Sequence, residues 1–151
     1  MCDIPLDVAD GENVVRAIFS NHVDNKTLRK NAFYERNDDV SVMRHTYIGS
    51  DQCKKHALEV KPGNANIKYK GLAVIGVRVV RDANSQVTDS REGNFCGHAH
   101  ISHEIEVPPA DDPLFAQQKL ELDERLRALK KAARYVADPN PESDGWSGPA
   151  L

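Results

Sequence analysis

One run of ten residues constrains the fold more than any other part of the chain. Residues 71–80, Gly-Leu-Ala-Val-Ile-Gly-Val-Arg-Val-Val, carry apolar side chains at both odd and even positions. Successive side chains of a strand point to opposite faces of a sheet, so a strand of this kind has both of its faces covered. The run therefore predicts a strand over 67–80 that lies inside a layered structure.

Three further segments have the composition of strands. They are residues 13–19, 39–47 and 95–107, the last of which stops at a pair of prolines. Between them, a weak helical centre is expected at 26–30, a helix over 51–58 capped by Ser50, and a long surface loop at 82–94. The four strands predict a small, mostly antiparallel sheet.

A single long helix is expected over residues 113–137. Asp112 is a suitable N-cap, and Pro113 stands where the first turn of a helix tolerates proline. The residue before Pro139 is disfavoured in the helical region, so the helix should end near Ala137. One apolar stripe runs along it, consisting of Phe115, Leu122, Leu126, Leu129, Ala133 and Val136. This stripe should pack across one face of the sheet.

The sheet and the helix together predict one α+β domain over residues 13–137, a small sheet covered by a long C-terminal helix. Residues 1–12 are rich in acids and predict a flexible N-terminal arm. Residues 138–151 are rich in Pro, Gly and Ser and predict a flexible C-terminal tail. The tail holds Trp146, the only tryptophan, which is expected to fold back onto the domain.

Composition excludes several classes of protein. Hydrophobic residues make up 40% of the chain and charged residues 28%, as in ordinary globular domains. No apolar run approaches the roughly 18 residues of a membrane span, and the acidic N-terminus does not have the pattern of a signal peptide. A net charge of −3 argues against a nucleic-acid partner. The three cysteines, Cys2, Cys53 and Cys96, form no Cys-x-x-Cys motif and predict reduced thiols in the cytoplasm.

Histidines are concentrated in the segment Cys96–Glu104. On a strand, His98 and His100 share a face, and two such imidazoles can bind zinc, iron or copper. A third metal ligand would come from His103 or else from Glu104, His22, His45, His56 or Cys96. Structural or acid–base roles of the histidines are the alternatives. The spacing His-x-His-x-x-x-Glu resembles the first metal motif of cupins. A cupin needs a second histidine motif on a later strand, which this chain does not have, so we exclude that family.

A second set of residues resembles the order found in ADP-ribosyltransferases. In that family a strand arginine holds a nicotinamide dinucleotide, a serine on a later strand orders the pocket, and a late glutamate stabilises the reacting sugar. Arg16, Ser41 and the pair Glu104 and Glu106 occur here in the same order. The resemblance implies NAD as a cofactor and a carboxylate pair on one strand face.

A third resemblance is to a family of short, uncharacterised bacterial proteins. It rests on Arg16-x-x-Phe-x-x-His22, Ala32-Phe33, Asp39-Val-Ser-Val42 and His98-Ala-His-Ile101. It implies a bacterial cytoplasmic protein with no known activity, in which His22, Ser41 and His98 meet in one pocket. Ser41 and a histidine could then act as nucleophile and base, although no Gly-x-Ser-x-Gly motif surrounds the serine.

These observations leave two classes of function open. The first is a small accessory or recognition module without a cofactor, which acts through a protein partner bound by residues 138–151. The second is an enzyme, either an ADP-ribosyltransferase-like protein that uses NAD or a hydrolase centred on histidines or a transition metal. The candidate catalytic residues are Arg16, His22, Ser41, Glu104 and Glu106, and the candidate metal ligands are His98, His100 and His103.

Overall fold

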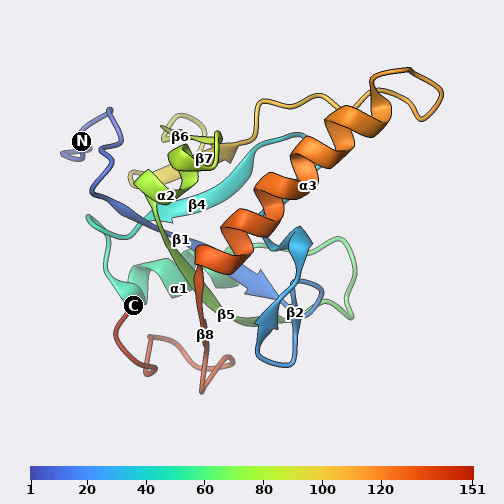
Figure 1. Cartoon of the computed structure of the whole chain (residues 1–151). Coiled ribbons are helices and arrows are strands. Elements are labelled where there is room, and N and C mark those ends of the chain that lie inside the picture. The colour runs from blue at the N-terminus through green and yellow to red at the C-terminus, as the bar shows by residue number, and fades with distance from the viewer.

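A computed structural model describes all residues 1–151 and has an α+β architecture. Six strands form one antiparallel sheet in the order β6-β7-β4-β1-β5-β8 (Figure 1). They are β1 (Asn13–Phe19), β4 (Val40–Arg44), β5 (Tyr69–Gly76), β6 (Gln86–Asp89), β7 (His98–Ser102) and β8 (Arg134–Ala137). Two short strands, β2 (Val23–Asp24) and β3 (Thr27–Leu28), form a separate hairpin. The helices are η1 (Lys30–Phe33), α1 (Ser50–Glu59), α2 (Val77–Asp82) and α3 (Phe115–Ala132).

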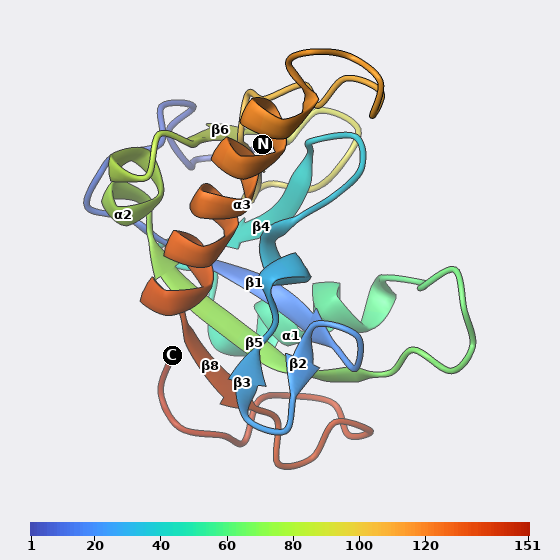
Figure 2. The ribbon, with the colours of Figure 1, turned by 45° about the vertical axis from the view of Figure 1, so that its right-hand side comes forward.

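The sheet lies between helices on both faces. Figure 2 shows α3 in front of the sheet and α1 behind it. The alternation along β1 explains the two layers, because Val14 and Ile18 belong to the hydrophobic cluster that includes Leu129 of α3. Val15 of the same strand belongs to the second cluster, which includes Cys53 of α1. The prediction that the sheet is antiparallel and covered by the long helix is therefore confirmed.

The apolar run at 71–80 is only partly a strand. Residues up to Gly76 form β5 and are covered on both faces, as predicted, but Val77–Asp82 form α2. The backbone N–H of Val77 donates to the carbonyl oxygen of Glu12 at 2.9 Å, and that of Arg78 to the carbonyl of Asp10 at 3.1 Å. The first amides of a helix need such partners from outside the helix. The N-terminal segment supplies them, and the strand turns into a helix at this point.

The prediction of one helix over 113–137 is wrong at its C-terminal end. The helix α3 ends at Ala132, and Arg134–Ala137 form β8 at the edge of the sheet, paired with β5. Only Leu126 and Leu129 of the helix are buried, while Leu120 is 56% exposed. The first half of α3 extends past the edge of the sheet (Figure 1). The apolar stripe thus packs on the sheet over only part of its length.

Other predicted elements are shorter or differ in kind. The predicted strand 95–107 is reduced to β7, because the Asp38 carboxylate accepts the backbone N–H groups of His103 and Glu104 and so replaces a strand neighbour. The predicted strand 39–47 is reduced to Val40–Arg44. The predicted loop 82–94 contains β6, and the weak helix at 26–30 is replaced by the β2–β3 hairpin.

The N-terminal arm is docked, which contradicts its predicted flexibility. A disulfide joins Cys2 to Cys96, so the prediction of three reduced thiols is also wrong, and only Cys53 is free. The fully buried guanidinium of Arg44 donates to the carbonyl oxygens of Pro5 and Asp7. The buried carboxylates of two residues compensate its charge, Glu12 at 2.8 Å and Asp89 at 2.7 Å.

The C-terminal tail is docked as well. Lys54, fully buried on α1, contacts the buried Asp138 carboxylate at 3.0 Å and donates to the Asn140 carbonyl oxygen at 2.7 Å. Trp146 packs against the hydrophobic cluster on the α1 face, and its indole N–H donates to the Pro149 carbonyl. The expectation that the tryptophan folds back is confirmed, and the expectation of a flexible tail is wrong. None of the helices is long and apolar enough to cross a membrane.

Candidate functional site

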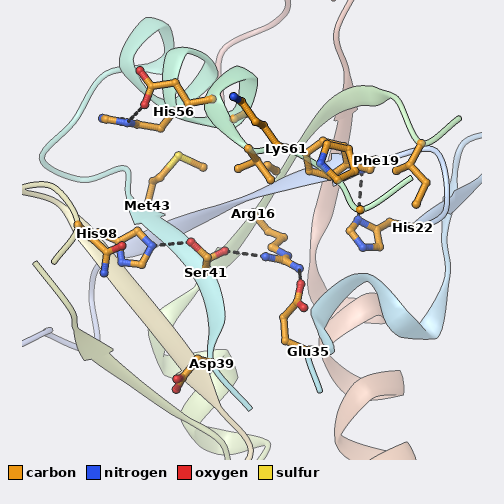
Figure 3. Close-up of a pocket in the computed structure, with 18 of the residues that line it drawn as sticks. Arg16, Phe19, His22, Glu35, Asp39, Ser41, Met43, His56, Lys61 and His98 are labelled. Carbon is orange, nitrogen blue, oxygen red and sulfur yellow. Dashed lines mark hydrogen bonds and ion pairs between the residues drawn. The ribbon is translucent and has the colours of Figure 1, made fainter. Parts of the chain in front are cut away.

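The sheet opens between its two central strands. β1 and β4 pair only at Val14–Arg44 and Val15–Met43, although β1 continues to Phe19 and β4 begins at Val40. A cavity of about 550 Å3 lies where the strands separate, within the range of small-molecule pockets. Four predicted site residues line it together, namely Arg16, His22, Ser41 and His98 (Figure 3).

Arg16 fills the opening between the strands. Its guanidinium donates to the Ala32 carbonyl at 3.1 Å and to the Ser41 carbonyl at 3.0 Å, a carbonyl that a continued ladder would pair with β1. A third N–H donates to the Glu35 carboxylate at 2.6 Å. Burial lowers the pKa of Arg16, and the Glu35 carboxylate opposes that shift. Three of the five N–H groups are engaged in this way, so two remain for a ligand.

A chain of hydrogen bonds crosses the sheet from β4 to the end of β6. The Ser41 hydroxyl lies 2.5 Å from Nε2 of His98, and the Ser90 hydroxyl lies 2.5 Å from Nδ1 of the same ring. The residue His98 on β7 pairs with Met43 on β4, so its side chain points to the same face as Met43 and Ser41. The imidazole is thus fixed between two hydroxyl groups at the wall of the cavity.

Burial keeps the His98 ring neutral. The residue is 5% exposed, and burial, helped by the nearby His100, lowers the pKa of its side chain to about 4. A neutral imidazole carries one N–H and one free lone pair. When Nδ1–H donates to Ser90, Nε2 accepts the hydroxyl proton of Ser41. This arrangement is the one that a serine nucleophile and its base require.

His22 presents a second neutral imidazole. The backbone N–H of Phe19 donates to its Nδ1 at 3.2 Å, so the ring proton is on Nε2. Burial and the positive charge of Arg16 lower the pKa of His22 to about 4. The ring adds a neutral N–H donor to the lining of the cavity.

The three predicted metal ligands do not come together. Both ring nitrogens of His103 are engaged, Nδ1 with the Ser85 hydroxyl at 2.7 Å and Nε2 with the Phe33 carbonyl at 2.7 Å, in the buried interior. His98 and His100 are neighbours with ring centroids 5.0 Å apart, but both nitrogens of His98 are used by serines. No group of three or more His, Cys, Asp or Glu side chains could hold a metal ion, so the predicted metal centre is not formed.

The two predicted carboxylates also lie outside the cavity. Glu104 and Glu106 follow the end of β7 and line a separate pocket with Asp38 and Arg36. Glu104 has a left-handed backbone with φ of 54°. The two residues are therefore not on one strand face, and the order expected of an ADP-ribosyltransferase site does not correspond to one cavity.

Sequence reasoning missed two residues of the site. Glu35, the charge partner of Arg16, lies in an irregular segment after η1 where no periodicity points to it. Ser90 follows β6, which was expected to be loop, and nothing in its neighbourhood distinguishes it from other loop serines.

A scan against protein-family models, a search of curated proteins and a search of solved structures find no match to this chain.

Proposed function

We propose that the chain is a hydrolase in which the Ser41 hydroxyl is the nucleophile and His98 is the general base. The observation that carries this proposal is the 2.5 Å contact between Ser41 Oγ and His98 Nε2 at the wall of an open cavity. Ser90 occupies the other ring nitrogen and holds the imidazole in the required orientation. Ser41 lies on β4, His98 on the neighbouring β7 and Ser90 directly after β6, so the sheet holds the arrangement in place.

The reaction follows from these positions. Ser41 Oγ attacks the carbonyl carbon of an ester, and its proton passes to Nε2 of His98. The tetrahedral intermediate then breaks its bond to the alcohol oxygen, which takes the proton from His98. Water repeats the sequence on the acyl-serine and releases the carboxylic acid. The guanidinium of Arg16, which donates to the backbone carbonyl of Ser41, supplies positive charge beside the developing oxyanion.

The environment of His98 limits the class of bond that is cleaved. A carboxylate in the place of Ser90 would stabilise the imidazolium that forms during the reaction, whereas a hydroxyl group does so only weakly. The pKa of His98, lowered by burial to about 4, makes the ring a weak base at neutral pH. Esters, whose alcohol leaves more readily than an amine, therefore suit this site better than amides.

The test is covalent labelling with p-nitrophenyl acetate. We expect the folded protein to take up one acetyl group on Ser41, located by mass spectrometry of its peptides, and to release nitrophenol with turnover. Ser41→Ala should remove the label and lower the rate by about a thousandfold or to background, because the nucleophile is lost. Ser90→Ala should lower the rate by about tenfold, since one neutral hydrogen bond is worth about 1 kcal/mol.

The matched control is Ser143→Ala, which removes an exposed serine of the tail and should change neither label nor rate. His98→Gln should abolish labelling of Ser41 while circular dichroism shows an intact fold. Acetylation of lysines alone, with Ser41 unmodified in folded wild-type protein, would refute the proposal.

The partner-dependent recognition module remains a prediction. It rests on the lack of a recognised catalytic motif in the sequence and on flexible ends, and both ends are docked on the domain. A pull-down that loses a bound protein when residues 138–151 are removed would favour it.

The disulfide also bears on the location of the protein, because disulfides persist mainly in oxidising compartments. It favours action outside the cytoplasm over the expected cytoplasmic site.

A further inference from the structure

The cavity beside Ser41 has two chemically different parts. One end is the polar row of Ser41, His98 and Asp39 at the strand ends. The rest of the lining mixes polar and apolar side chains, and its apolar part comes from β1, β4, α1 and the loops beside them. This apolar wall includes Phe19, Met43, Ala57, Val60, Ile67 and Phe95, most of which belong to or pack against one hydrophobic cluster. A ligand that fills the cavity from Ser41 outward therefore meets hydrocarbon on one side of the reacting serine.

The apolar wall begins directly at the nucleophile. Met43 is two residues from Ser41 on the same strand and points to the same face, as Figure 3 shows. The Phe95 ring packs edge-on against His98, with ring centroids 5.1 Å apart. Ile67 lies further along the wall and is half-buried. A group attached to the carbonyl carbon at Ser41 can thus lie along a continuous apolar surface.

The charges of the cavity disfavour an ionised acyl group. Arg16, the cation nearest to Ser41 in the hydrogen-bond network, is already paired with Glu35 at 2.6 Å. Asp39 adds a second carboxylate, with its side chain 55% exposed at the polar end. Glu59 adds a third carboxylate and Lys61 a second cation, so the lining carries more negative than positive charge and repels a carboxylate on the substrate.

We propose that the site hydrolyses esters of uncharged, apolar carboxylic acids, whose acyl chain packs against Met43, Phe95 and Ile67. This inference rests on the proposed hydrolase and names its substrate class. The bond broken is the one between the acyl carbon and the alcohol oxygen, and the acid and the alcohol are released with water consumed. The acyl chain gains binding energy by leaving water as it enters the apolar wall.

The experiment compares kcat/KM for the p-nitrophenyl esters of acetate, butyrate and hexanoate and for the half ester of succinate. We expect kcat/KM to rise by about two- to fourfold for each methylene group that is buried. The succinate ester, which resembles butyrate in length but is charged, should react at least tenfold more slowly than the butyrate ester. Ile67→Trp, which fills part of the wall, should lower the ratio of hexanoate to acetate by about tenfold.

The control is Leu120→Trp, the same enlargement at an exposed position on α3, which should leave that ratio unchanged. If Ile67→Trp does not fold, the comparison of kcat/KM among the four esters with the wild-type protein still tests the inference. A flat series, or a succinate ester as good as butyrate, with acetyl-Ser41 still formed, would overturn this inference and leave the hydrolase in place. Failure of every ester to acylate Ser41 would overturn the hydrolase and, with it, the substrate class.

Discussion

At the scale of single residues, His22 and His98 make the stability of the fold dependent on pH. Burial lowers the pKa of both to about 4 from the ordinary 6.5. Between these two values the unfolded chain binds protons that the native protein does not, so the free energy of unfolding falls as the pH is lowered through this range. A difference of one in pKa between the unfolded and folded states is worth about 1.4 kcal/mol, so each histidine accounts for roughly 3 kcal/mol between pH 7 and pH 4.

Chemical unfolding measured from pH 7 to pH 4 should show this loss, and His22→Gln should make the curve flatter. Glutamine can still accept the N–H of Phe19 but has no proton to gain. The carboxylate of Asp89 does not interfere in this window. Burial would raise its pKa, but hydrogen bonds from Arg91 and Arg44 lower it to about 2. Titration of both rings near 6.5 in the folded protein, followed by NMR, would contradict the prediction.

The residues of the site show what a sequence can and cannot predict. Strand periodicity places His98 and His100 on one face, and this is observed. The resemblance to short bacterial proteins named His22, Ser41 and His98 as one pocket, and all three line the same cavity. Ser90 and Glu35 are brought in by chain segments distant in sequence. Their contacts depend on the tertiary fold, so no local sequence pattern predicts them.

At the scale of elements, the end of α3 shows how sheet pairing overrides a helical pattern. Ala133 and Val136 continue the apolar stripe of the helix, yet the backbone at Ala133 is extended with ψ of 145°. The next four residues gain strand partners along β5, with Val136 opposite Leu72. A β-branched valine next to an aromatic residue favours this state. The helical period is local, whereas the pairing depends on a strand some sixty residues earlier, so the sequence pattern alone misplaced the boundary.

Gly71 makes the β5–β8 pairing possible. A Cβ atom at this position would lie 2.3 Å from the Val136 carbonyl oxygen and 3.0 Å from Cα of Ala137. We therefore expect Gly71→Ala to push β8 off the sheet edge and to lower stability by about 1–3 kcal/mol, as overpacking does. The urea midpoint should fall, and the amides of β8 should exchange faster with solvent. Gly63→Ala is the control, because a Cβ there meets nothing within 4 Å.

At the scale of the whole molecule, long-range links hold both ends of the chain on one domain. The sequence correctly predicted the α+β class and the cover of the sheet by a C-terminal helix. Apart from the return of Trp146 onto the domain, it did not predict docked ends, because each depends on partners far along the chain. Arg44 holds the N-terminal segment through backbone carbonyls, and Lys54 holds the tail through Asp138. Spacing and composition carry no information on either contact.

The disulfide is the covalent link among these, and its removal gives a prediction for the molecule as a whole. Cys2 and Cys96 are separated by 94 residues, and cross-linking a loop of this length is worth roughly 4 kcal/mol. Cys96 is exposed, so a reductant can reach the bond. We expect reduction, or the double substitution Cys2→Ser with Cys96→Ser, to lower the free energy of unfolding by about that amount. The amides of residues 2–8 should exchange faster with solvent.

The double variant also provides the control, because a reductant should have no further effect on it. The free thiol of Cys53 does not affect this comparison of oxidised and reduced protein, since burial raises its pKa to about 12 and leaves it protonated. Cys96 lies two residues before His98, and Phe95 packs against that ring. If loosening of the arm reaches this loop, the rate of Ser41 acetylation should fall with reduction in the wild type only. Equal stability of oxidised and reduced protein would mean that the arginine contacts alone hold the arm.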